Sequence, residues 1–492
     1  MGEYKALVAG TLPAIELCAN PIMMSTHPHA GTGAATEMPV LDCAAAIPGI
    51  QVAAQALMAP TKFRYLTVTA VVIANMIGTG VFTSLGFQLL DIRSGFVLLM
   101  LWAVGGIAAL CGALTYAELG AALPRSGGEY NFLTRIYHPA AGFVSGWVSA
   151  TIGFAGPTAL AAMTFAAYAL TVLPGDQGAV MEKLLAASLL IILTLIHATN
   201  RRNSGSVQMV FTVLKIGIIV LFSSAAFIWV DTPQPVNFLP VAGDGALLTS
   251  SAFAVSLIYV SFAYSGWNSA TYLSGELENP QGTLPWILVT GTVTVMLLYL
   301  ILNITFLHTA SMNAMVGQVE VGYIAAEAAF GDIGGRFTGL VLALLLISTV
   351  SAMTMAGPRV IQVIGEDFPS LKFLGKQNQH GVPAIAIYSQ SGIAMLFILS
   401  STFESILVFA GFTLALNSFA TVLGIFVLRW RQPDLPRPYK TFLYPLPPLI
   451  FLTLTGWTLW FVLLSRPTEG LFGIGIIATG LIFYFISARQ RK

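Results

Sequence analysis

Charged residues are scarce in this 492-residue chain. Asp, Glu, Lys and Arg make up 9% of it and hydrophobic residues 56%, whereas roughly 25% of an ordinary soluble domain is charged. The formal net charge of +1 gives the molecule no strong field that would attract nucleic acid. The composition therefore indicates an integral membrane protein, whose surroundings are the lipid bilayer.

Cysteine and histidine are also rare. Cys18, Cys43 and Cys111 are too few and too scattered for a disulfide framework or a Cys-rich metal site. None of the six histidines is spaced as HxxxH, so the sequence gives no sign of a metal site. It also contains no recognisable cluster of nucleophile, base and acid. We expect neither a cofactor nor an enzyme activity.

The first 61 residues contain apolar residues but no run long enough to cross a membrane. They do not resemble a secretory signal, because no basic region precedes an apolar core of the right length. We interpret residues 1–61 as a disordered cytoplasmic tail. The alternative is a misassigned start, since Met58 directly precedes the first credible span.

Long apolar segments follow from there to the end of the chain. A spanning helix needs about 20 mostly apolar residues, and the polar breaks leave about twelve such segments. They are residues 66–90, 95–122, 140–172, 183–200, 205–230, 249–275, 284–309, 334–364, 382–401, 404–429, 441–464 and 469–488. The intervening segment Val319–Phe330 is too short to cross, and we expect a short helix on the outer surface there.

The basic residues are distributed unevenly between alternate loops, and this predicts the orientation. One set of loops holds Lys62, Arg64, Arg125, Arg135, Arg201, Arg202, Arg359, Lys372, Lys376, Arg429, Arg431, Arg437, Lys440, Arg489, Arg491 and Lys492. The other set holds Arg93, Lys183, Arg336 and Arg466. The first set is expected inside, which places both termini in the cytoplasm and requires an even number of spans.

Two of the expected spans are interrupted. The first contains NMIGTGVFTSLG, with Gly78 and Gly80 around Thr79. Glycines often serve close packing between membrane helices, but adjacent residues fall on different faces, so we favour local unwinding. The sixth span carries Ser265 and Gly266, followed by Asn268 and Ser269, among apolar residues. Paired interruptions at corresponding positions of two halves indicate a binding site between inverted repeats.

Unwinding leaves backbone groups unpaired, which is tolerated at membrane depth only where they line a wet cavity. The N–H groups near Gly78, Thr79 and Gly80 would begin a half-helix, whose positive end suits a carboxylate. The carbonyls around Phe262 and Ala263 would end the other half-helix and suit an ammonium. Together these groups predict a site for a free α-amino acid, read through its main chain.

Several motifs then carry a resemblance to a known family. They are IGTGVF (Ile77 to Phe82), TYAELGAALPRSGGEYNFL (Thr115 to Leu133), FAYSGWN (Phe262 to Asn268), GELENP (Gly275 to Pro280) and AGPR (Ala356 to Arg359). The chain from about residue 62 onward resembles amino acid permeases of the amino acid-polyamine-organocation superfamily, in particular the L-type amino acid transporter branch. The resemblance implies an all-α membrane fold of the leucine-transporter type, working by alternating access. It further implies two inverted five-helix repeats, residues 62–232 and 245–432, and two extra helices within 433–492.

Lys215 is the most informative single residue, because an ionisable group in mid-membrane is costly and is a functional hypothesis by default. Snorkelling is the alternative, but the residue lies about ten positions from either end of its span. The resemblance implies that its ammonium occupies a region that holds sodium in other members, meeting carbonyls near Gly78 and hydroxyls of Ser348 or Thr349. We therefore expect no sodium requirement, with either exchange or proton coupling.

Other side chains complete the expected site, which also includes Ile77. By resemblance Phe262 is a gate over the substrate, although a packed core aromatic is the alternative. Ser265 replaces a glycine common in relatives with large substrates, which favours small or medium side chains. Glu118 and Glu276 lie near cytoplasmic helix ends and are expected in an inner-gate network.

No carboxylate falls beside the two breaks, which disfavours cationic amino acids and polyamines. The outer loop from Leu173 to Lys183 has no cysteine, where animal relatives use one to bind a glycoprotein heavy chain, so we expect no disulfide-linked partner. The leading hypothesis is a sodium-independent transporter of neutral L-amino acids in the plasma or cell inner membrane. A transporter of cationic amino acids or polyamines and a non-transporting amino acid sensor remain as alternatives.

Overall fold

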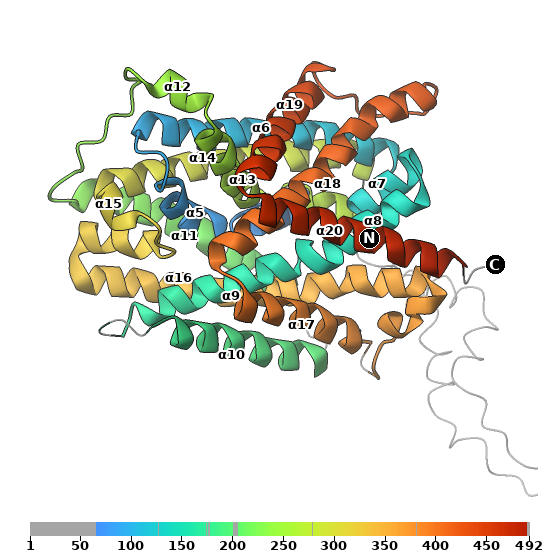
Figure 1. The fold of residues 1–492 in the computed structure, drawn as a ribbon, viewed down its shortest axis with the longest axis horizontal. Helices are drawn as coiled ribbons and strands as arrows, with labels where there is room; N and C mark the ends of the chain where they lie inside the picture. Colours follow the sequence, from blue (N-terminus) through green and yellow to red (C-terminus); the bar gives the residue numbers. More distant parts are fainter. Residues whose placement is uncertain are drawn as a thin grey trace, which may run out of the picture. The chain divides into compact units, whose positions relative to one another are not determined.

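The computed structural model describes residues 65–125, 127–173, 175, 178–199, 205–277, 279–379 and 381–489. The expected tail, residues 1–61 with Met58, lies outside this range. The description below concerns the unit that begins at Phe63. Its residues form an assembly of helices (Figure 1).

Most helices of this unit are long and apolar. They are α4 (Tyr65–Met76), α5 (Gly80–Gln88), α6 (Gly95–Ala122), α7 (Gly128–Ile136), α8 (Pro139–Val148), η2 (Ser149–Gly153), α9 (Ala155–Leu170), α10 (Gly178–Thr199), α11 (Gly205–Trp229), α12 (Asp244–Leu248), α13 (Ser251–Ala263), η3 (Ser269–Glu276), α14 (Pro280–Thr309), α15 (Met312–Met315), α16 (Val321–Asp367), η4 (Pro369–Gly375), α17 (Ala384–Ser400), α18 (Phe403–Arg431), α19 (Leu446–Ser465) and α20 (Pro467–Arg489). Here η2 is a π-helical turn, and η3 and η4 are 3-10 helices.

The described residues include ten helical segments that are long and apolar enough to cross a membrane. Two shorter apolar helices, Ser251–Ala263 and Ala384–Ser400, take the places of the expected sixth and ninth spans. Ten and two together correspond to the twelve expected spans. The prediction of an all-α, multi-pass membrane protein is confirmed.

The eighth span agrees with the prediction of a short helix at Val319–Phe330 followed by a span at 334–364. The element α16 (Val321–Asp367) consists of two helices that join at a kink. The two parts meet at Gly331, whose backbone is non-helical (φ 73°, ψ 179°). The glycine allows this turn, because it has no Cβ that would oppose a positive φ.

Both predicted interruptions are present. The first span consists of α4 and α5, separated by Ile77–Thr79. The sixth consists of α13, a turn over residues 264–268, and η3. The two breaks are in direct contact, and each places a glycine against the backbone of the other.

The two contacting glycines explain why these positions carry no side chain. A Cβ on Gly80 would lie 2.5 Å from the Ala263 Cα, and one on Gly266 would lie 2.8 Å from the Asn75 carbonyl oxygen. Gly266 also has φ +98°, a conformation that L side chains rarely adopt. The glycines therefore permit the close approach of the two breaks.

The interior consists of apolar side chains on both sides of α13. Phe253, Leu257 and Val260 belong to the larger buried cluster, whereas Ile258 and Phe262 belong to a second one. Packing partners agree with this division: α14 lies along α6, and α16 lies along α9 (Figure 1). The first half of the broken sixth span therefore contributes to both clusters, and it packs against α5, α6, α18 and α19.

Candidate functional site

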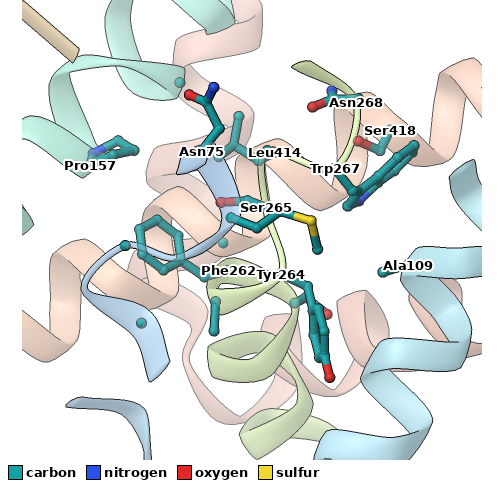
Figure 2. A pocket seen from close by; sticks show the side chains of 18 of the residues that line it. Asn75, Ala109, Pro157, Phe262, Tyr264, Ser265, Trp267, Asn268, Leu414 and Ser418 are labelled. Atoms are coloured by element: carbon teal, nitrogen blue, oxygen red, sulfur yellow. The ribbon is translucent and has the colours of Figure 1, made fainter. Parts of the chain in front are cut away.

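A cavity of about 170 Å³ lies where the two breaks meet. The first span lines it with Asn75, Gly78, Thr79 and Gly80. The sixth span contributes residues 261–269 and Tyr272, and α6, α7, η2, α9, α16, α18 and α19 complete the walls. Figure 2 shows side chains of the sixth span, including Phe262, Ser265, Trp267 and Asn268, gathered around this space.

The start of α5 presents unpaired backbone N–H groups to the cavity. The N–H of Gly78 donates to the Met76 carbonyl at 2.7 Å. In contrast, the N–H groups of Thr79, Gly80 and Val81 have no acceptor among the described residues. A buried unpaired N–H group costs about 1–3 kcal/mol, and a helix start favours negative charge. This part of the cavity therefore suits an anionic group that accepts several hydrogen bonds.

The carbonyls that end α13 are mostly occupied. The Phe262 carbonyl accepts from the N–H groups of Tyr264 and Ser265, the latter at 2.9 Å. The Ala263 carbonyl accepts from the Tyr299 hydroxyl at 3.0 Å. The carbonyl of Ser261, the residue before Phe262, accepts no hydrogen bond in the described part of the chain.

Tyr299 connects the ends of both half-helices. Its hydroxyl lies 2.5 Å from the Met76 carbonyl oxygen and 3.0 Å from that of Ala263. Because a phenol has one proton, it donates to one carbonyl at a time or is shared between them. Tyr299 is buried in α14, and sequence reasoning could not tell this contact from an ordinary bond between helices.

Lys215 is buried in α11 and contacts both the first and the eighth spans. Its ammonium donates to the Ile77 carbonyl at 3.1 Å and to the Thr349 hydroxyl at 2.9 Å. The Ser348 hydroxyl, the other candidate, donates instead to the Leu345 carbonyl within its own helix. The ammonium thus satisfies a carbonyl that the break in the first span leaves without a helical partner.

A carboxylate that the sequence analysis did not assign lines the same cavity. Glu129, in the first turn of α7, is 3% exposed. It accepts hydrogen bonds from Tyr116 (2.8 Å), Asn268 (2.8 Å) and Tyr272 (2.5 Å). The expectation that the site contains no carboxylate is therefore wrong.

This error arose because Glu129 lies far from either break in the sequence. The SGGEY motif is part of the family resemblance, and no periodicity in the sequence indicates where this segment meets the rest of the fold. The sequence offers one signal, an acidic residue that directly follows two glycines.

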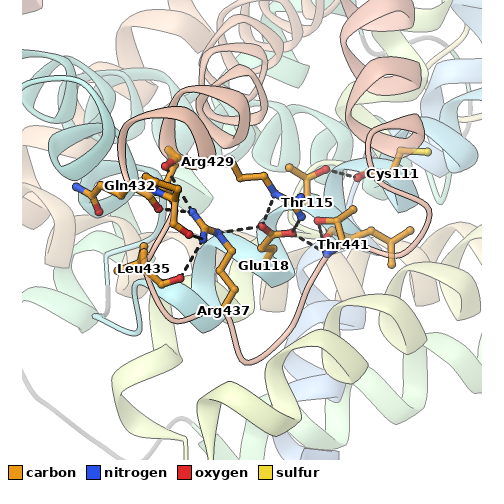
Figure 3. A network of polar contacts seen from close by, with 11 residues as sticks. Cys111, Thr115, Glu118, Arg429, Gln432, Leu435, Arg437 and Thr441 are labelled. Atoms are coloured by element: carbon orange, nitrogen blue, oxygen red, sulfur yellow. Dashed lines mark hydrogen bonds and ion pairs between the residues drawn. The ribbon is translucent and has the colours of Figure 1, made fainter.

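Glu118 belongs to a different polar network, at the end of α6 (Figure 3). Its carboxylate accepts from the Arg429 Nε at 2.8 Å and its NH2 nitrogen at 2.7 Å, and from the Thr441 N–H at 2.7 Å. Arg437 Nε is 3.6 Å away. These contacts fix the 432–445 segment onto α6, and Glu118 does not line the cavity. The side chain of Glu276 lies outside the described part of the chain.

Metal ligands do not gather anywhere in the described residues: no group of three or more His, Cys, Asp or Glu side chains could hold an ion. The polar features of the cavity are backbone N–H groups, amides, hydroxyls and one carboxylate. Such groups bind and orient a small polar molecule.

Comparisons with known proteins give the family. A family model described as "Amino acid permease" matches residues 63–486. The mouse large neutral amino acids transporter small subunit 2 is 29% identical over 445 residues, which cover 85% of this chain and 79% of that protein.

Two further relatives have different names. The mouse b(0,+)-type amino acid transporter 1 is 28% identical over 424 residues, 85% of each chain. The mouse Asc-type amino acid transporter 1 is 29% identical over 438 residues, 86% of this chain and 80% of that protein. With two interrupted spans around a polar cavity and a family match over most of its length, this chain belongs to the amino acid permease family.

Proposed function

We propose that this protein is a secondary active transporter of neutral L-amino acids that works by alternating access. The observation that carries the proposal is the pair of unpaired N–H groups of Thr79 and Gly80 at the cavity. A substrate carboxylate would accept from them, replacing water, and would lie at the positive end of α5. The names of the relatives support this substrate class.

The substrate ammonium would bind on the opposite side of the cavity. The Ser261 carbonyl has no partner among the described residues, and the Phe262 and Ala263 carbonyls each retain lone-pair capacity. The substrate side chain would extend along Ser265, which favours small or medium substrates. Phe262 would close over the bound molecule, with Glu118 and Glu276 proposed at the inner end.

Sodium independence follows from Lys215 in this proposal. Its ammonium donates to the Ile77 carbonyl and the Thr349 hydroxyl, both oxygen groups of the kind that coordinate a sodium ion. A fixed positive charge at that place leaves no electrostatic reason for a sodium ion to bind. Transport would then be driven by exchange against internal amino acid or by protons.

One observation favours a second candidate class of substrate. Glu129 lines the cavity without a cation in ion-pair distance among the described residues. A cationic side chain would supply that charge, so transport of cationic amino acids or polyamines stays in consideration. The four hydroxyl and amide groups around Glu129 already satisfy the carboxylate, which is why we place the neutral class first.

The membrane context is part of the proposal. The excess of basic residues in one set of loops favours a plasma or cell inner membrane location with both termini in the cytoplasm. Two of the relatives above are not named as subunits, whereas one is named a small subunit. The absence of cysteine from Leu173 to Lys183 supports function without a disulfide-linked heavy chain.

Reconstitution tests the proposal directly. Purified protein in liposomes is given a panel of labelled L-amino acids, with and without internal amino acid and with and without an inward proton gradient. Uptake that needs internal substrate indicates an exchanger, and uptake driven by the gradient in empty vesicles indicates proton coupling. Saturable binding without uptake in any condition would favour the amino acid sensor. The absence of both binding and uptake would refute the proposed substrate class.

A further inference from the structure

Two carboxylates, Glu129 and Glu404, each bind a different half of the sixth span. Glu129 binds η3, which follows the break, and Glu404 binds α13, which precedes it. Both act through a tyrosine hydroxyl. Glu129 and Tyr272 line the cavity themselves, whereas Tyr259 and Glu404 do not, and the cavity residues 261–269 lie between Tyr259 and Tyr272 in the sequence.

The first contact set, here called the η3 clamp, consists of Glu129, Asn268 and Tyr272. Asn268 Nδ2 donates to Glu129 Oε1 at 2.8 Å, and the Tyr272 hydroxyl donates to Oε2 at 2.5 Å. Tyr116 of α6 and Ser418 of α18 donate to Oε1 at 2.8 and 3.5 Å. The part of the sixth span that follows the break is thereby tied to α6, α7 and α18 through one carboxylate.

The local sequence delivers this carboxylate to η3. Gly127 and Gly128 have φ of +116° and +52°, and a Cβ on Gly128 would lie 2.9 Å from the Tyr272 ring. Consecutive left-handed residues reverse the chain before α7, and only glycine adopts them without a steric cost. The first turn of α7 then directs Glu129 inward, where it is 3% exposed.

The second contact set, the α13 clamp, consists of Glu404, Tyr259 and Arg466. The Tyr259 hydroxyl donates to Glu404 Oε1 at 2.8 Å, and Arg466 NH2 donates to the same oxygen at 2.5 Å. The ring of Phe87 at the end of α5 contacts the Tyr259 ring, with centroids 6.1 Å apart. This clamp therefore joins α13 to α18 and also involves the second half of the first span.

Both clamps contact the same helix, α18. Glu404 is in the first turn of α18 and Ser418 is 14 positions later in the same helix, so they are separated by about 20 Å along its axis. Gly411, Leu414 and Ala415, which line the cavity, fall between them. The clamps consequently lie on opposite sides of the cavity along α18.

We propose that Glu129 and Glu404 are positioning residues that hold the cavity shut on its two sides, so that each side opens only when its tyrosine leaves the carboxylate. This inference rests on the proposed alternating access. The hydrogen bonds involve a charged acceptor and are among the stronger kinds in proteins. Because the two carboxylates bind different halves of the sixth span, weakening one clamp favours opening on that side alone.

The test measures which side of the membrane reaches the cavity. Ala109, a cavity residue of α6, is replaced by cysteine in a chain whose native cysteines are changed to serine or alanine. A membrane-impermeant maleimide is then applied to right-side-out and to inverted vesicles. Tyr272→Phe and Tyr259→Phe each delete one clamp hydroxyl, and Tyr388→Phe, at a half-exposed site on α17, is the matched control.

We expect Tyr272→Phe to raise the labelling rate roughly tenfold, equivalent to about 1.4 kcal/mol, when the maleimide is applied to the membrane face nearer η3. Tyr259→Phe should give the same increase when the maleimide is applied to the opposite membrane face. Labelling equal to the Tyr388→Phe control on both sides, or an increase on the same side in both variants, would overturn the proposal. If either variant folds poorly, Asn268→Ala replaces the first and Arg466→Gln the second.

A double-mutant cycle separates a clamp from a general loss of packing. The effect of Tyr272→Phe should largely disappear in a Glu129→Gln background, because the two residues share one interaction. Fully additive effects would contradict the assignment. Labelling needs no substrate, so it tests the clamps independently of transport. Side-specific opening without any amino acid uptake would support the clamps and refute the proposed function.

Discussion

Replacing Lys215 by methionine should abolish transport and leave the protein nearly as stable as before. Methionine retains most of the side-chain volume but removes the ammonium that donates to the Ile77 carbonyl and the Thr349 hydroxyl. Each hydrogen bond from a charged group contributes about 1.5–3 kcal/mol. Opposing this loss, the variant no longer has to desolvate a buried ammonium, which costs several kcal/mol.

These two contributions are of similar size, so the net change in the free energy of unfolding should be small. The remaining cost is the Ile77 carbonyl, which is left unpaired at about 1–3 kcal/mol. That cost is concentrated at the break of the first span, next to the N–H groups of Thr79 and Gly80. Substrate binding should therefore suffer far more than global stability.

The assay compares uptake by reconstituted protein with thermal unfolding of the same preparation. Lys183→Met is the control, because its ammonium also donates to a carbonyl, that of Leu399 at 3.1 Å, but at an exposed site of α10. We expect at least a tenfold loss of uptake in Lys215→Met and wild-type uptake in Lys183→Met. Uptake by Lys215→Met within twofold of wild type would refute the reasoning.

Further predictions concern the breaks, the coupling ion and the Glu118 network. Gly78→Val should abolish substrate binding without preventing folding, because a Cβ there meets nothing closer than 3.9 Å and extends into the cavity. Gly80→Ala should destabilise the fold, because its Cβ would lie 2.5 Å from the Ala263 Cα. Unchanged affinity in the first or unchanged thermal stability in the second would contradict the geometry of the breaks. Exchanging external sodium for choline should not alter the initial uptake rate, and a strong dependence would exclude the proposed role of the ammonium. Glu118→Gln should lower the melting temperature, since breaking a buried ion pair costs roughly 3–5 kcal/mol. The cost should lie at the lower end of that range, because Arg429 is 25% exposed. An unchanged melting temperature would show that the network is dispensable for stability.

The sequence was sufficient to predict the fold class and the positions of the two breaks. Spanning helices follow from the length of apolar runs, which is a local property. The interruptions at Gly78–Gly80 and at Ser265–Ser269 were also visible locally, because small and polar residues stand out in an apolar helix. The structure confirms both breaks. Lys215 is conspicuous for the same reason, because an ionisable residue stands out within an apolar segment whatever its partners are.

Family resemblance supplied what local patterns did not. It connected Lys215 with the eighth span, and the structure brings the ammonium to Thr349 rather than to Ser348. These two hydroxyls are adjacent in sequence, so only the rotation of α16 about its axis decides which of them faces α11. No sequence pattern fixes that rotation to within one residue.

Only the tertiary structure brought Glu129 to the cavity and Tyr299 to the ends of both half-helices. Glu129 is more than 130 positions from Tyr272 in the chain, and Tyr299 is more than 200 from Met76. Such contacts depend on how helices pack, which many side chains determine together. The sequence by itself determined the membrane helices and where two of them break, because hydrophobicity and backbone freedom are local; packing alone decided which distant carboxylate and hydroxyl groups meet there.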